Sequence, residues 1–208
     1  MKPLELLLLD CSPRRDNSTS RHLTNQLLPA LTHRFGRPVH VTQRHLGVKP
    51  VPAITAEYAD SLVLPAEEAR ARFGNQLAVS DELIRELDAA EVVWISTPVH
   101  NFTVPAVLKN WIDHVVRRDV TFVTKDNRKV GLLRDRPVYV AVTAGGAMFR
   151  EPAIQPDFFR PYLTAVLGVI GLKDITYLPS TSLAGVDAPL ELVQTHASRH
   201  LAAAALQI

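Results

Sequence analysis

Residues 91–118 contain the pattern that most limits how this chain can fold. An apolar run rich in β-branched residues, Val92 to Ile95, is too short for a typical helix and suits a buried strand. Eight residues that favour a loop follow, Thr97 to Val104. Pro105 then falls in the first turn of a helix, where its missing N–H costs no intrahelical hydrogen bond. The loop therefore lies at the carboxyl end of a strand, which is the edge where open α/β sheets bind ligands.

The helix after this loop has one apolar face. Lys109 and Asp113 fall on the opposite, solvent-facing side of this helix. Its apolar residues recur with helical spacing, at Val104, Val107, Leu108, Trp111, Ile112 and Val115. We therefore expect this face to be buried against the sheet.

A second unit of strand, loop and helix begins the chain. Leu4 to Asp10 reads as a buried strand, the polar run from Cys11 to Ser20 is full of turn and cap residues, and a helix follows with Leu23, Leu27, Leu28 and Leu31 on one face. Free N–H groups and the positive dipole end at a helix start, with added hydroxyl donors, make the geometry of a phosphate site. The same Ser/Thr cluster taken alone is more often only an N-cap.

Known phosphate-binding motifs are absent from this run. It contains neither Gly-x-Gly-x-x-Gly nor Gly-Lys-Ser/Thr, which excludes the dinucleotide fingerprint and the P-loop. A low-molecular-weight tyrosine phosphatase would need Cys-(x)5-Arg, and Asn17 stands where that arginine belongs. The phosphatase interpretation is therefore rejected.

Three further strands are predicted, at residues 38–46, 137–142 and 173–178, with a final helix at 187–205. The strand at 137–142 runs into Gly145 and Gly146, and paired glycines let the backbone approach a ligand closely. Between the second and third strands we expect a charged helix over 57–73 and another helix capped near Ser80. Residues 120–133 are predicted to form a hairpin. Strands that alternate with helices indicate a doubly wound parallel sheet.

The bulk composition fits one soluble domain over residues 1–208, with 47% apolar and 21% charged residues. A net charge of +2 and scattered basic residues give no reason to expect nucleic acid. Cys11 is the only cysteine, so no internal disulfide is possible. No signal peptide or membrane-spanning run is evident, and we expect a cytoplasmic protein without a membrane partner. His40 and His45 lack a nearby third ligand, so we expect surface histidines rather than a metal site.

Three separated motifs resemble the FMN-dependent NADH azoreductases, a family of flavodoxin-like quinone and azo reductases. The most specific is Pro98-Val99-His100-Asn101-Phe102, followed by Pro105, Leu108-Lys109 and Trp111-Ile112-Asp113. The others are Ser12 with Ser18-Thr19-Ser20, and His114-Val115-Val116-Arg117 with Thr121-Phe122 and Gly131-Leu132-Leu133. Val99 and His100 replace the family's usual Met and Tyr, and Thr143-Ala144 replaces Ser-Arg before the paired glycines.

The resemblance implies a five-stranded sheet in the order 2-1-3-4-5, with helices on both faces, and a homodimer. It implies that FMN is bound by Ser12, Ser18, Thr19, Ser20, Pro98, Val99, His100, Asn101, Phe102, Thr143, Ala144, Gly145 and Gly146. It further implies that NADH or NADPH passes two electrons, in a ping-pong cycle, to quinones or azo compounds. The flavin carries this chemistry, so no catalytic side chain is expected, although His100 is a candidate proton donor.

Two alternatives share the predicted fold. One is an NADPH-dependent FMN reductase or an electron-transfer flavoprotein, which differs in its electron acceptor. The other is a flavodoxin-like scaffold without a cofactor, which the departures at Val99, His100 and Ala144 keep open. An NAD(P)H oxidation assay with competing electron acceptors would distinguish the first alternative from a quinone or azo reductase. A test of flavin binding would distinguish the second.

Overall fold

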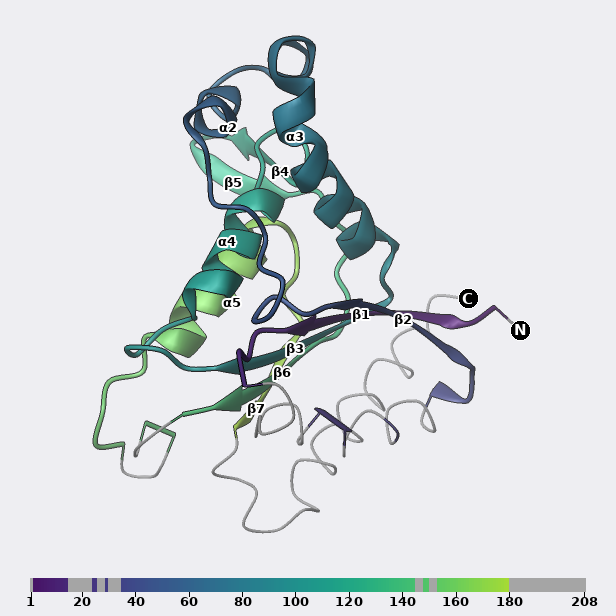
Figure 1. The fold of residues 1–208 in the computed structure, drawn as a ribbon, viewed down its shortest axis with the longest axis vertical. Helices are drawn as coiled ribbons and strands as arrows, with labels where there is room; N and C mark the ends of the chain where they lie inside the picture. The colour runs from purple at the N-terminus through teal and green to yellow at the C-terminus, as the bar shows by residue number, and fades with distance from the viewer. Residues whose placement is uncertain are drawn as a thin grey trace.

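The computed structural model describes residues 2–14, 24–25, 29, 35–144, 148–149 and 153–179. Apolar runs that suit burial on both faces form the central strands of a five-stranded parallel sheet, and the edge strand β2 is more polar and exposed (Figure 1). Its strands are β1 (Leu4–Asp10), β2 (Val39–Arg44), β3 (Val92–Pro98), β6 (Val138–Thr143) and β7 (Ile175–Pro179). They lie in the order β2-β1-β3-β6-β7, and every neighbouring pair is parallel.

This order agrees with the predicted 2-1-3-4-5 once the two strands of a separate hairpin are left out of the numbering. The chain moves outward from β1 to β2 and then returns to place β3 on the other side of β1. The sheet therefore has its topological switch point between β1 and β3, which is where such folds bind ligands. The carboxyl ends of the strands point to the left of Figure 1.

The core divides into two layers because alternate side chains of a strand point to opposite faces. One layer contains Leu7, Leu9 and Ile95, together with apolar residues of the covering helices. The other contains Leu6, Trp94, Tyr139 and their neighbours. Trp94 Nε1 donates a hydrogen bond of 2.8 Å to Thr24 Oγ1, so the indole N–H is satisfied in the second layer.

The longer helices described by the structure cover the first of these faces (Figure 1). They are α3 (Ala66–Ala89), α4 (Ala106–Val115) and α5 (Phe159–Val169), and the short α2 (Ala56–Ser61) packs beside α3. The prediction for α4 is confirmed, since its apolar face is buried and Lys109 Nζ lies 2.6 Å from Asp113 on the exposed side. Pro105 is the N-cap of α4 rather than a residue of its first turn.

The predicted helix start at Ser80 is wrong. Ser80 lies inside α3, whose N-cap is Pro65 and whose only non-helical backbone is a kink at Phe73. The Ser80 hydroxyl donates to His114 O at 2.6 Å and accepts from Arg117 Nη1 at 2.8 Å. Because these tertiary partners satisfy the buried hydroxyl, Ser80 does not have to cap a helix.

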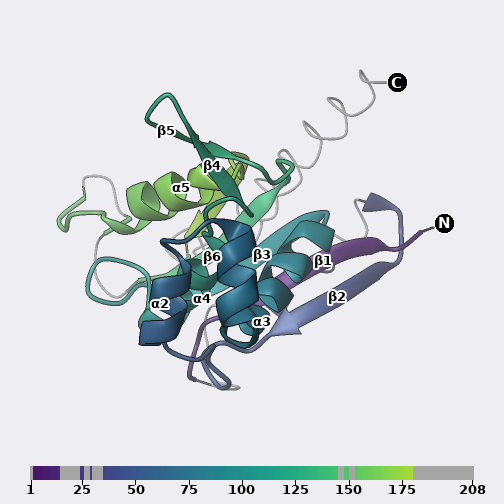
Figure 2. The ribbon, with the colours of Figure 1, turned by 90° about the horizontal axis from the view of Figure 1, so that it is seen from above.

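The predicted hairpin is confirmed as β4 (Phe122–Lys125) and β5 (Arg128–Gly131). It projects to one side of the sheet, next to α5 (Figure 2). A Cβ on Gly131 would lie 2.2 Å from the backbone nitrogen of Gly171, so a glycine is needed where the hairpin meets the end of α5.

The predicted first and last helices lie mostly outside the described residues. In the first of them, Thr24, Asn25 and Pro29 are described and are helical. Helices on the second face of the sheet therefore remain a prediction. Within the described ranges, no helix is both long and apolar enough to cross a membrane.

Candidate functional site

Backbone hydrogen bonds hold together the segments that follow β1, β3 and β6. The Cys11 N–H donates to Ser96 O at 2.8 Å, which joins the end of β1 to β3. The Val99 N–H donates to Thr143 O at 2.7 Å, and Pro98 is in register with Thr143. The three segments that contain the residues predicted to bind a cofactor therefore start from the same edge of the sheet.

The segment after β3 forms a tight turn with an unusual backbone. His100 and Thr103 exchange two backbone hydrogen bonds, of 3.0 and 3.1 Å. Between them, Asn101 and Phe102 have φ values of +47° and +70°. Two consecutive positive φ angles define a type I′ turn. A phenylalanine rarely adopts this conformation, and such strain concentrates at functional sites.

This turn presents one aromatic ring and two backbone donors. Phe102 remains 41% exposed although its side chain is large and apolar. The N–H groups of Val99 and His100 are already bonded within the protein. In the part of the chain that the structure describes, those of Asn101 and Phe102 have no backbone acceptor. Asn101 and Phe102 are therefore the residues of this loop whose amides can bind a ligand.

The segment after β1 is shaped by two side chains that accept backbone hydrogen bonds. Asp10 Oδ1 accepts from the Ser12 N–H, and Ser12 Oγ accepts from the Arg14 N–H, both at 3.2 Å. Ser12 Oγ thus accepts one hydrogen bond from the protein and keeps its own O–H free to donate, which fits an anion such as a phosphate. Sequence reasoning missed Asp10, and the available signal was an acidic residue at the end of an apolar strand.

Three predicted ligands after β1 and two after β6 lie outside the described residues: Ser18, Thr19, Ser20, Gly145 and Gly146. Thr143 and Ala144 are described and are partly buried at the end of β6. The prediction that these residues bind FMN is therefore carried by Ser12, the segment from Pro98 to Phe102, and Thr143 with Ala144.

Cys11 is placed as a core residue rather than a nucleophile. Its side chain is fully buried in the layer under the helices. Burial raises the pKa of the Cys11 thiol far above its usual range, despite an opposing hydrogen bond from Thr97. The thiol is therefore protonated at neutral pH, which agrees with the rejection of a phosphatase.

Comparison with known proteins identifies the family. The model of a family described as having a flavodoxin-like fold matches residues 5–204. An FMN-dependent NADH:quinone oxidoreductase from Cupriavidus pinatubonensis is 43% identical over 180 residues, covering 86% of this chain and 87% of its own length. One from Pseudomonas fluorescens is 43% identical over 175 residues, covering 83% and 82%. The chain belongs to this family of FMN-dependent NADH:quinone oxidoreductases. The family resemblance and the enzyme class predicted from the sequence are confirmed.

Solved structures agree on the fold of this oxidoreductase family member. An azoreductase from Bacillus anthracis str. Sterne superposes with a TM-score of 0.73 at 21% identity, covering 94% of this chain and 99% of its own. An FMN-dependent NADH-azoreductase from Bacillus anthracis str. Ames Ancestor in complex with FMN gives a TM-score of 0.72 at 22% identity, covering 94% and 98%. At these identities the likeness shows a shared fold.

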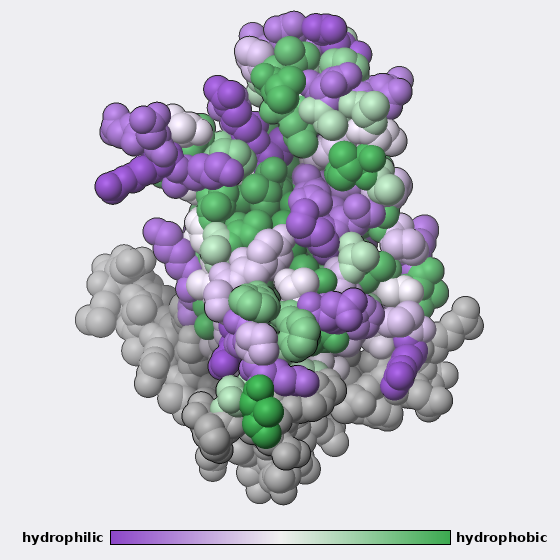
Figure 3. All heavy atoms as spheres, turned by 90° about the vertical axis from the view of Figure 1, so that its left-hand side faces the viewer, coloured by the Kyte–Doolittle hydropathy of each residue, from purple (hydrophilic) through white to green (hydrophobic). Residues whose placement is uncertain are grey.

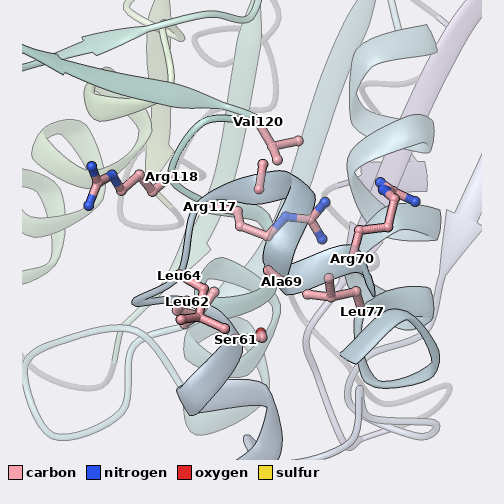
Figure 4. Close-up of a pocket in the computed structure, with 10 residues that line it drawn as sticks. Ser61, Leu62, Leu64, Ala69, Arg70, Leu77, Arg117, Arg118 and Val120 are labelled. Atoms are coloured by element: carbon pink, nitrogen blue, oxygen red, sulfur yellow. The ribbon is translucent and has the colours of Figure 1, made fainter. Parts of the chain in front are cut away.

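A small cavity elsewhere in this oxidoreductase is too small for a flavin. It has a volume of about 40 Å³ and is lined by residues of α2, α3 and the segment Arg117–Val120 (Figure 4). Arg117 is held there by Asp81 at 2.5 Å and Ser80 at 2.8 Å. By volume it would hold only about three water molecules.

The described residues also contain no group of His, Cys, Asp and Glu arranged to hold a metal ion. His40 Nδ1 lies 2.7 Å from Glu5 Oε2, and His45 Nδ1 lies 3.4 Å from Asp10 Oδ2. Each of these histidines thus contacts a carboxylate of β1. His45 is the one that lies near the carboxyl edge.

Proposed function

We propose that this protein is an FMN-dependent NADH:quinone oxidoreductase that also reduces azo compounds. The observation that carries the proposal is that the Ser12 segment and the strained Asn101–Phe102 turn both follow neighbouring strands, β1 and β3, at the carboxyl edge of the sheet. The enzyme family supports it, because relatives at 43% identity are named for this reaction. A scaffold without a cofactor has no need for a half-exposed phenylalanine in a left-handed conformation.

In this proposal the segment after β1 binds the phosphate of FMN. The Ser12 hydroxyl donates one hydrogen bond to it, and Ser18, Thr19 and Ser20 supply further donors. No lysine is required, because hydroxyl and backbone N–H groups at a helix start can hold an anion. The dinucleotide fingerprint and the P-loop are not needed for such a site.

The segments after β3 and β6 hold the ring system. Pro98, Val99 and Phe102 would supply apolar contact to it, and Thr143, Ala144, Gly145 and Gly146 would supply further contacts. The N–H groups of Asn101 and Phe102 would donate to its polar atoms, because backbone donors stabilise negative charge in a site that excludes water. When bound, FMN supplies the two-electron chemistry that the amino acids lack.

We propose a ping-pong cycle in which NADH or NADPH and then the electron acceptor occupy the same pocket in turn. The protein orients each substrate by the turn after β3 and keeps water from the reacting face. His100 is exposed on that turn and can give a proton to the reduced acceptor, since imidazole exchanges protons near neutral pH. A quinone and an azo compound both need protons as well as electrons.

We also propose that the enzyme is one cytoplasmic domain that works as a homodimer. The face formed by α4 and α5 has a hydrophobic hollow below charged side chains (Figure 3). Leu132 and Val130 of the hairpin segment are 50% and 41% exposed. Exposed apolar surface is typical of protein interfaces where it forms a contiguous patch.

The visible absorption spectrum of the purified protein tests the proposed function. Flavin bands are expected after FMN is added, and they should bleach when NADH is added without oxygen. Quinone, azo dye and free FMN are then compared as acceptors, and faster NADH oxidation with free FMN would favour the FMN reductase alternative. A protein that binds no flavin would overturn the proposal.

A further inference from the structure

The loop after β2 packs directly on the segment that carries Ser12. The Gly47 N–H donates a hydrogen bond of 3.1 Å to Asp10 O. A Cβ on Gly47 would lie 2.2 Å from Ser12 O and 2.7 Å from Pro13 N. Both are backbone atoms, so no side-chain rotation can relieve the contact. Any other residue at position 47 must displace one of the two loops.

The loop after β2 is held more firmly than a typical surface connection. Leu46 is 1% exposed and belongs to the same core layer as Cys11. The carbonyl of His45 accepts hydrogen bonds from the N–H groups of Val48 at 3.0 Å and Lys49 at 2.7 Å. A loop anchored in the core and closed on itself can act as a fixed support for its neighbour.

Asp10 connects this support to Ser12. Its Oδ2 lies 3.4 Å from His45 Nδ1, while its Oδ1 accepts the Ser12 N–H at 3.2 Å. The Asp10 side chain is 3% exposed, so its orientation is defined by such contacts. His45 thus acts on Ser12 through one buried carboxylate, and Gly47 acts on it through direct backbone contact.

We infer that Gly47 and His45 are positioning residues that set the place of the Ser12 hydroxyl and so the affinity for the phosphate of FMN. The inference rests on the proposed function, because Ser12 is taken as a phosphate ligand. A merely structural role would weaken every flavin equally. A positioning role weakens FMN but spares riboflavin, which has the same ring and no phosphate.

Gly47→Ala tests the direct contact. Dissociation constants of FMN and riboflavin are measured by fluorescence titration of the full-length, flavin-free protein. We expect FMN binding to weaken by about tenfold, the loss typical of one hydrogen bond to a charged group, and riboflavin binding by less than about threefold. Gly74→Ala is the matched control, since a Cβ there meets nothing within 4 Å and should change neither constant.

His45→Ala and His45→Gln test the indirect contact through Asp10. They also test the positioning role by themselves if Gly47→Ala does not fold. The His45 side chain is 49% exposed, so His45→Ala should weaken FMN binding only about twofold to threefold. His45→Gln should restore it, because the glutamine amide can donate to Asp10. His40→Ala is the control, since His40 contacts Glu5 near the other end of β1.

Equal losses for FMN and riboflavin, or no loss in either variant, would overturn the inference while leaving the proposed function intact. If the unmodified protein binds no FMN, the proposed function fails and this inference fails with it. A loss confined to FMN in either variant, with both controls unchanged, supports the positioning role.

Discussion

Two turns in this molecule share one backbone conformation but differ in the residues that form it. In the hairpin, Asp126 and Asn127 have φ values of +48° and +58° between the paired residues Lys125 and Arg128. In the turn after β3, Asn101 and Phe102 have φ values of +47° and +70° between His100 and Thr103. Both are type I′ turns, which require two consecutive residues with positive φ.

The difference lies in the second central residue. Asn and Asp tolerate the left-handed conformation, so the hairpin turn is made of residues suited to it. Phe102 does not, and a left-handed residue with a Cβ costs roughly 1–2 kcal/mol. The residue is 41% exposed, so packing recovers only part of this cost. The hairpin turn is thus built from residues that suit its conformation, whereas the turn after β3 contains one that does not, which agrees with the proposed role of Phe102 in flavin binding.

Phe102→Gly should have the largest effect on flavin binding. Glycine adopts positive φ freely, so relief of strain offsets lost burial, and we expect the free energy of unfolding to stay within about 1 kcal/mol. FMN affinity should fall about tenfold or more, because ring contact with an aromatic side chain is lost. Urea unfolding and flavin titration measure the two quantities. Unchanged flavin affinity with a clear loss of stability would show that Phe102 serves the fold.

Asn101→Ala should have an intermediate effect on both properties. Alanine is less tolerant of positive φ, so the turn should be destabilised by about 1 kcal/mol. We expect FMN affinity to fall severalfold, since the neighbouring N–H donors lose their alignment. Asn101→Gly, which permits the conformation, should recover most of the stability, as thermal unfolding can measure. A variant with full stability and full flavin content would contradict the role given to this turn.

Asn127→Gly is the hairpin counterpart of Phe102→Gly and should change little. Glycine suits the second position of a type I′ turn, so the expected change in stability is within about 0.5 kcal/mol. FMN affinity should equal that of the unmodified protein in the same titration. A matching loss of FMN affinity would break the comparison, because the two turns would then both contribute to the site.

Lys129→Gln should have the smallest effect. Lys129 Nζ lies 5.0 Å from the ring centroid of Phe122, and an exposed cation–π contact contributes about 0.5–1 kcal/mol. Only a slight decrease in the melting temperature is expected, with no change in flavin binding or NADH oxidation. A loss of activity would instead place the hairpin in the functional site.

Most of the fold is predictable because β1, β3 and β6 are short apolar runs bounded by turn residues. The run at β3 and the helical spacing of α4 were read directly, and both are found as expected. The cap-like sequence at Ser80 wrongly predicts a helix start, because it cannot reveal that His114 and Arg117 satisfy the Ser80 hydroxyl in the folded protein.

The site was predictable by residue but not by conformation. The segment from Pro98 to Phe102 was recognised by its motif, yet nothing in the side chain of Phe102 favours a positive φ. That conformation is imposed by the bridge between His100 and Thr103. The role of Gly47 was equally hidden, because it depends on a contact with Ser12, which lies 35 positions earlier in the sequence.

A crystal structure of the full-length protein with FMN tests the central claim most directly. The account predicts that the FMN phosphate accepts a hydrogen bond from Ser12 Oγ. It also predicts that the ring edge meets the N–H groups of Asn101 and Phe102, with the turn after β3 still left-handed. Flavin bound away from the carboxyl edge of the sheet, or bound there without contact to this turn, would contradict the account.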